Sequence, residues 1–194
     1  MKQLLRDVCI GTGIMASSHT QMRLLRCDRW PRQRRKNDIF GANEDEIHKR
    51  LSNAESAEDN EHVGKIEIGS VRLNFWDLGG QEELHSLWHK YFEDSHALIF
   101  IVDACDVSRF SEVATAFRRV MDSQAVQRMP VLVVCNKSDM EECASAECIR
   151  ELTADERHRG DLALVPVSAL QGLNVERCIR WLLTALTRNS AGYT

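Results

Sequence analysis

The sequence predicts an α/β domain with a doubly wound, mostly parallel sheet. Three short apolar runs are typical of strands buried on both faces: ALIFIVD (Ala97 to Asp103), PVLVVCN (Pro130 to Asn136) and LALVPVS (Leu162 to Ser168). Apolar residues at helical spacing lie between and after these runs. Strands that alternate with helices imply right-handed crossovers and a largely parallel sheet.

The remaining elements follow from periodicity. KIEIGSVRLNF alternates apolar and polar residues on both sides of Gly69-Ser70, which predicts a β-hairpin. Two helices are indicated by the apolar faces Val113, Ala116, Phe117, Val120, Met121 and Val175, Cys178, Ile179, Leu182, Leu186, with Trp181 also predicted in the core. A further helix would bury Leu84, Leu87, Trp88 and Tyr91. Its His85 and His89 have zinc spacing but no third ligand, so solvent-facing histidines are the better interpretation.

The chain of 194 residues has two unequal parts. Residues 1–62 are polar, with a basic run followed by an acidic run, and we expect them to be largely disordered. A basic arm that touches an anionic membrane is the functional alternative. GTGIMA (Gly11 to Ala16) fits a dinucleotide fingerprint, but no second βαβ unit follows it. Residues 63–189 form the predicted domain and 190–194 a short tail.

Composition narrows the function classes. A net charge of −4 gives no reason to expect nucleic acid as a partner. Seven cysteines without a C-x-x-C pair suggest a reducing, cytoplasmic setting. No apolar run approaches the length that crosses a bilayer, and MKQLLRDVCIG does not form a signal peptide. We therefore expect a soluble protein that meets membranes, if at all, peripherally.

Small and polar residues follow three of the predicted strands. They are Asp77-Leu78-Gly79-Gly80-Gln81, Asn136-Lys137-Ser138-Asp139 and Ser168-Ala169-Leu170. Each alone is a common turn. Because ligands of open α/β sheets bind at the carboxyl ends of the strands, the three together predict one site at that edge.

These motifs carry a resemblance. Val63 to about Asn189, with FWDLGGQ, EELHSLWHKYFEDSHALIFIVDACD and NKSD, is similar to the ADP-ribosylation-factor branch of small GTPases. The resemblance implies a P-loop GTPase-like fold and a switch that binds GTP or GDP with Mg²⁺ and hydrolyses GTP. It also implies a role in vesicle trafficking at Golgi membranes, with effectors and regulators that contact Trp76 and Tyr91.

The resemblance assigns the base-binding residues. Asp139 would accept two hydrogen bonds from the guanine edge, which adenine cannot offer. Asn136 would meet the base or brace the neighbouring loop, and the Lys137 stem would cover the ring. In Ser168-Ala169-Leu170, the Ala169 N–H would reach the guanine carbonyl oxygen. Leu170 stands where the family often has lysine, which weakens only a ring-covering contact.

The resemblance also assigns the phosphate side. Asp77 would hold Mg²⁺ through water, and the Gly80 N–H would contact the γ-phosphate. Gln81 would orient the attacking water. The stretch from Asp77 to Gln81 is thus expected to sense the last phosphate.

The chain departs from the family pattern at its N-terminal end. It has no G-x-x-x-x-G-K-[ST], His62 replaces the switch threonine, and Lys65 replaces an apolar residue. Losing three or four charge-assisted bonds costs on the order of 5–10 kcal/mol, or roughly four to seven powers of ten in affinity. A non-enzymatic GTPase-like interaction protein is therefore the alternative function. We also expect a poor or missing central first strand, for which Leu4–Ile10 is the only candidate.

Overall fold

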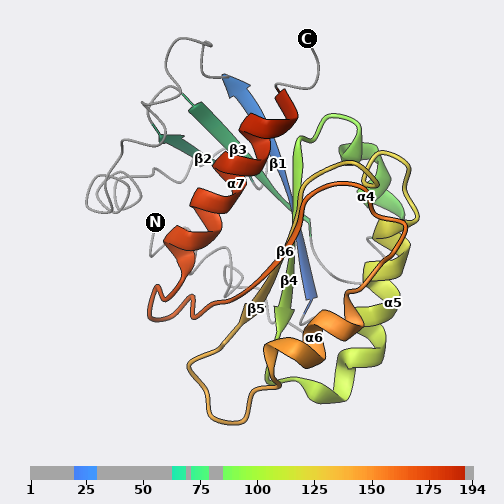
Figure 1. Ribbon diagram of the computed structural model, residues 1–194, viewed down its shortest axis with the longest axis vertical. Coiled ribbons are helices and arrows are strands. Elements are labelled where there is room, and N and C mark those ends of the chain that lie inside the picture. The colour runs from blue at the N-terminus through green and yellow to red at the C-terminus, as the bar shows by residue number, and fades with distance from the viewer. Residues whose placement is uncertain (1–19, 30–62, 69–70, 79–84, 191–194) are drawn as a thin grey trace.

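The computed structural model of the chain describes residues 20–29, 63–68, 71–78 and 85–190 (Figure 1). One six-stranded sheet lies between helices on both faces, which confirms the predicted α/β, doubly wound class. Most of the predicted N-terminal segment, 1–62, lies outside the described residues, as do residues 191–194 of the predicted tail.

The strand order is β2-β3-β1-β4-β5-β6. β2 (Val63–Ile68) and β3 (Val71–Leu78) form the predicted antiparallel hairpin. β4 (Ala97–Asp103), β5 (Val131–Asn136) and β6 (Leu162–Pro166) pair in parallel, which confirms the three buried runs as strands. Pro166 ends the edge strand β6, as suits a residue without a backbone N–H.

The centre of the sheet is occupied by β1 (Thr20–Arg29), which runs antiparallel to both neighbours. Leu25 pairs with Phe75 on one side and with Ala97 on the other. The assignment of Leu4–Ile10 as the only candidate for this place is therefore wrong, and that segment lies outside the described residues. The backbone groups of β3 and β4 need partners, and this need outweighs the basic composition of β1.

The direction of β1 has a topological consequence. β3 and β4 point the same way because each is antiparallel to β1, so the carboxyl ends of β3, β4, β5 and β6 meet at one edge. Thr20 pairs with Val102 at that edge, whereas Arg29 pairs with Arg72 at the opposite one. The expected weakness of the first strand thus takes another form: the strand is present but reversed.

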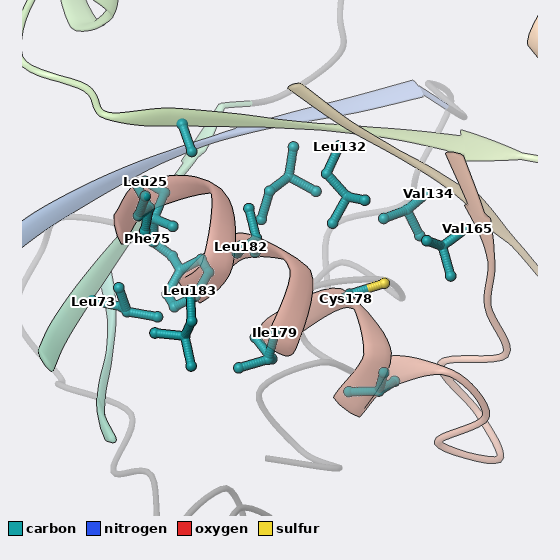
Figure 2. Packing of buried hydrophobic residues seen from close by; sticks show 14 of the residues in the cluster. Leu25, Leu73, Phe75, Leu132, Val134, Val165, Cys178, Ile179, Leu182 and Leu183 are labelled. Atoms are coloured by element: carbon teal, nitrogen blue, oxygen red, sulfur yellow. The ribbon is translucent and has the colours of Figure 1, made fainter. Parts of the chain in front are cut away.

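Two apolar clusters fill the spaces on either side of the sheet. Alternate residues of β4 serve each one: Ala97, Ile99 and Ile101 face one cluster, and Leu98, Phe100 and Val102 the other. α7 (Val175–Ser190) covers the first side, where Leu182 and Ile179 pack toward β-strand residues such as Leu132 (Figure 2). Trp181 is partly buried against the same cluster, as predicted.

The opposite face is covered by three helices (Figure 1). They are α4 (His85–Phe92), α5 (Phe110–Met121) and α6 (Ala146–Leu152). In α4, Trp88 is buried as predicted, but Tyr91 is 41% exposed and does not belong to the buried face. His89 is exposed as expected. α6 was missed, although Ser145 caps it by accepting a hydrogen bond from the Cys148 N–H at 3.2 Å.

Truncation of Leu25 tests whether β1 fills the sheet. Leu25 is fully buried, so Leu25→Ala is expected to lower the free energy of unfolding by about 2–5 kcal/mol. Leu162→Ala on the edge strand, 43% exposed, is the matched control and should cost less than about 1 kcal/mol. Urea denaturation of both variants measures the difference, and equal midpoints would exclude β1 from the core.

Candidate functional site

The predicted site residues gather at the carboxyl edge of the sheet. Asn136 ends β5 and is paired in register with Asp103, the last residue of β4, which was not among the predicted site residues. Asp77 is the penultimate residue of β3 and pairs with Arg23 of β1. The carboxyl ends of β3, β5 and β6, which precede the three predicted motifs, thus lie along one edge, in agreement with the topological expectation.

Asn136 joins the loops that follow β5 and β6. It is 6% exposed, and its Oδ1 accepts a hydrogen bond from the Ala169 N–H at 3.1 Å. The Ser138 N–H donates to the Val167 carbonyl oxygen at 3.1 Å, which ties the same two loops a second time. Of the two roles predicted for Asn136, the structure contains the bracing one.

The loop after β6 is fixed from within. Ser168 is fully buried, and its Oγ accepts a hydrogen bond from the Gln171 N–H at 3.0 Å. Its carbonyl oxygen accepts one from the Gly172 N–H at 2.8 Å, where a φ of 78° suits glycine. Ala169 is 2% exposed and Leu170 is 57% exposed. In the predicted triplet, Ala169 is therefore buried, and the apolar side chain of Leu170 projects into solvent.

Lys137 is held over β4 by an ion pair. Its Nζ lies 2.6 Å from Asp103 Oδ2, and Asp103 Oδ1 accepts a hydrogen bond from the Cys105 N–H at 3.0 Å. Lys137 has a φ of 68°, an uncommon conformation for a residue with a side chain. Sequence reasoning missed Asp103, although its place at the end of the apolar run ALIFIVD was a signal.

Asp139 lies in the same loop as Asn136 and is half-buried. Within the described part of the chain, its carboxylate has no hydrogen-bond or ion-pair partner. The Ser138 Oγ, next to it, is buried and also lacks a partner among the described residues. The Asp139 carboxylate and the Ser138 hydroxyl thus have unused hydrogen-bonding capacity in the loop that follows Asn136. Such a set suits a ligand with N–H donors on one edge.

The phosphate side of the predicted site lies outside the described residues. This holds for Gly80, Gln81 and His62 and for the side chains of Asp77 and Lys65. Two residues were predicted to contact effectors. Trp76 is partly buried against the cluster under α4, α5 and α6, and Tyr91 is exposed on α4.

A disulfide between Cys105 and Cys143 adjoins the site. It links the loop after β4 to the loop after β5, across 38 positions of sequence. The cysteine count pointed to a reducing setting and did not foresee this bond. Only the fold brings the two loops together, so no local spacing signals it. None of the described helices is long and apolar enough to span a membrane.

Removal of the Asn136 amide tests the brace. Asn136→Ala leaves the buried Ala169 N–H without an acceptor, which is expected to cost about 1–3 kcal/mol of stability. Gln171→Ala, at an exposed side chain two residues beyond Ala169, is the control and should stay within about 0.5 kcal/mol of the parent. Guanidinium unfolding measures both. A neutral Asn136→Ala would mean that the brace contributes nothing to the fold.

Comparison with known proteins identifies the family. Residues 47–186 match the ADP-ribosylation factor family. ADP-ribosylation factor-related protein 1 of Rattus norvegicus and of Homo sapiens are each 40% identical over 131 residues, 66% of this chain and 65% of theirs. ADP-ribosylation factor-like protein 3 of Saccharomyces cerevisiae is 35% identical over 133 residues, 66% of this chain and 67% of that protein.

A solved structure shares the fold. It is the Arl6 BBS3 small GTPase of Trypanosoma brucei with the bound nucleotide analogue GppNp, at a TM-score of 0.59 and 22% identity, covering 73% of this chain and 88% of that one. This chain spans 65% of the length of the ADP-ribosylation factor-related proteins that it matches. With the family match extending over most of the chain, the protein belongs to the ADP-ribosylation factor family.

Proposed function

We propose that this protein binds guanine nucleotides and recognises them chiefly through the base. The observation that carries the proposal is the buried hydrogen bond from the Ala169 N–H to Asn136 Oδ1, which assembles the loops after β5 and β6 beside Asp139. Family membership supports the ligand class.

Asp139 is the expected specificity residue. A carboxylate accepts two hydrogen bonds, and the guanine edge presents two N–H donors that adenine lacks. The absence of another partner for this carboxylate among the described residues supports such a role. The Ala169 N–H would reach the guanine carbonyl oxygen only if Asn136 shares or releases it, because that hydrogen is already donated.

Lys137 would contribute its aliphatic stem. The ion pair with Asp103 fixes the ammonium end, which restricts the conformations that the partly exposed stem can adopt. Leu170 projects from the adjacent loop and would present an apolar surface to the ring in place of the usual lysine.

The phosphate side supports only weak binding. In the family the phosphate loop comes directly after the central strand, but here the carboxyl end of β1 lies at the edge remote from Asn136. Arg29, the last residue of β1, therefore lies at the edge of the sheet opposite the one where a phosphate loop would be needed. Asp77 would hold Mg²⁺ through water, and the ion would neutralise phosphate charge. Without the hydrogen bonds of a phosphate loop, the affinity for the nucleotide is expected to be roughly four to seven powers of ten lower than with them.

Hydrolysis of GTP to GDP, with Gln81 orienting water, is part of the proposal by family membership, as is a cytoplasmic role in vesicle trafficking peripheral to Golgi membranes. The second candidate is a non-enzymatic interaction protein that binds trafficking partners through Trp76 and Tyr91. The reversed β1 favours this candidate, because a segment that follows β1 starts at the edge remote from Asn136. Without hydrogen bonds to the phosphates, the protein would supply little catalysis of hydrolysis.

An exchange of base specificity tests the first candidate. Asp139→Asn replaces one acceptor by an NH₂ donor, which suits the carbonyl oxygen that xanthine carries in place of the guanine amine. Affinity for GDP should fall roughly 10- to 150-fold, while affinity for xanthosine diphosphate rises. Asp94→Asn, at an exposed acid before β4, is the control. Fluorescence titration with labelled nucleotides from micromolar to millimolar concentration gives the values, and unchanged base preference would refute the assignment.

Hydrolysis separates the two candidates. If the protein is a GTPase, phosphate release from GTP with Mg²⁺ should fall at least about tenfold in Gln81→Leu, because the attacking water loses its orienting group. Equal background rates for the parent and the variant would favour the interaction protein. If the parent protein instead retains bound nucleotide through purification, the non-enzymatic interaction protein is excluded.

A further inference from the structure

The two cysteines of the disulfide are held together by backbone bonds that do not involve sulfur. The Ala144 N–H donates to the Ala104 carbonyl oxygen at 2.8 Å, which joins the residue after Cys143 to the residue before Cys105. The Ala104 N–H donates in turn to the Asn136 carbonyl oxygen at 3.1 Å. The Cα atoms of Cys105 and Cys143 lie 4.1 Å apart. The fold therefore keeps the two sulfurs adjacent whether or not they are bonded.

The open, dithiol state has a partner ready for one of the thiols. Cys143 Sγ lies 2.9 Å from the Lys137 carbonyl oxygen, and Cys105 Sγ lies 3.8 Å from it. A thiol S–H at Cys143 can donate to this oxygen, whereas a disulfide sulfur has no hydrogen to give. Both states are thus compatible with the same loop geometry.

Three other cysteines, whose side chains the structure describes, are poorly placed to compete. Cys135 and Cys178 are buried, and burial raises the pKa of the Cys135 thiol to about 12, which keeps it protonated. Cys148 is exposed on α6, and the structure bonds it to no other cysteine. Cys105 and Cys143 are half-buried, so a small reagent can reach them while each has a partner at hand.

We propose that Cys105 and Cys143 are a reversible redox site, closed by a low-molecular-weight disulfide such as oxidised glutathione and reopened by the corresponding thiol. Its closure would lock the loop of residues 137–143, which carries Asp139. Oxidation has this effect because β5 holds one end of the loop at Asn136, and the covalent bond at Cys143 stops the other end from opening when the Ala144–Ala104 hydrogen bond breaks transiently.

The chemistry balances by thiol–disulfide exchange. One cysteine thiolate attacks a sulfur of oxidised glutathione, the glutathione S–S bond breaks, and one glutathione thiolate leaves. The second cysteine thiolate then attacks the mixed disulfide and releases the second glutathione. Two electrons pass from the two protein thiols to the glutathione disulfide, and the two thiol protons end on the released glutathiones or in solvent.

A consequence for ligand binding rests on the proposed function. Asp139 in a loop closed at both ends has less freedom to lose when it binds guanine, so the oxidised form should bind GDP about three- to tenfold more tightly. The backbone amides of residues 138–142 should also exchange about tenfold more slowly in the oxidised protein. The second effect needs no nucleotide.

The full chain and the variants Cys105→Ser, Cys143→Ser and Cys148→Ser test the site. Each is equilibrated in glutathione buffers of rising oxidised fraction, acid-quenched, alkylated and mapped by mass spectrometry without reduction. The parent and Cys148→Ser should yield a linked Cys105–Cys143 peptide. Cys105→Ser and Cys143→Ser should instead carry one glutathione on the remaining thiol, and only the first two proteins should show slowed exchange over residues 138–142.

The outcomes are distinguishable. Separate alkylation of Cys105 and Cys143 at a high oxidised fraction, or links from either to Cys9 or Cys27, would overturn the proposal. So would a linked peptide without slower exchange in the loop. If the link forms and exchange slows but labelled GDP binds neither state, the redox site stands and the proposed nucleotide function fails.

Discussion

The hydrogen bonds that β1 makes to strands on both of its sides hold this fold together. In the described sheet, β1 alone connects the β2–β3 hairpin to the parallel strands β4, β5 and β6 by backbone hydrogen bonds. A gap at that position would leave the facing edges of β3 and β4 with unpaired backbone groups in the interior. Any strand able to fill the gap therefore has a large advantage over none, even with a basic sequence and the opposite direction. The sheet requires pairing at this position, and an antiparallel strand supplies it as well as a parallel one would.

The sequence was informative wherever local pattern and structure coincide. The continuous apolar runs of β4 and β5 and the alternation around Gly69-Ser70 are signals that periodicity alone can detect. β1 carried no such signal, because its arginines are typical of a solvated segment and only its neighbours make it a strand. α6 was too short for a periodic face, and its capping residue Ser145 was the one available clue. The Cys105–Cys143 pair depends on two loops that meet only after folding.

The site shows the same division between local and distant determinants. The proposed base-binding side consists of the loops after β5 and β6, which the parallel strands and the Asn136–Ala169 hydrogen bond bring together. The positions of Asn136, Lys137, Asp139 and Ala169 in the loops after β5 and β6 were predictable because each comes after an apolar run in a recognisable order. A phosphate grip, by contrast, requires a strand that arrives at the site edge with its carboxyl end. Because β1 runs in the opposite direction, it does not meet this requirement, whereas the loops after β5 and β6 keep their arrangement.

The position of α7 bears on how the chain reaches this state. α7 is the only described helix on its side of the sheet (Figure 1). The cluster beneath it includes Leu25 from β1 and Leu186 from the last turns of α7. On a ribosome, α7 is the last described element to emerge. Until then the apolar face that includes Leu25 and Phe75 lacks its cover, and such surfaces attract chaperones or self-associate. Docking of α7, rather than formation of the sheet, is thus the step that removes this apolar face from solvent.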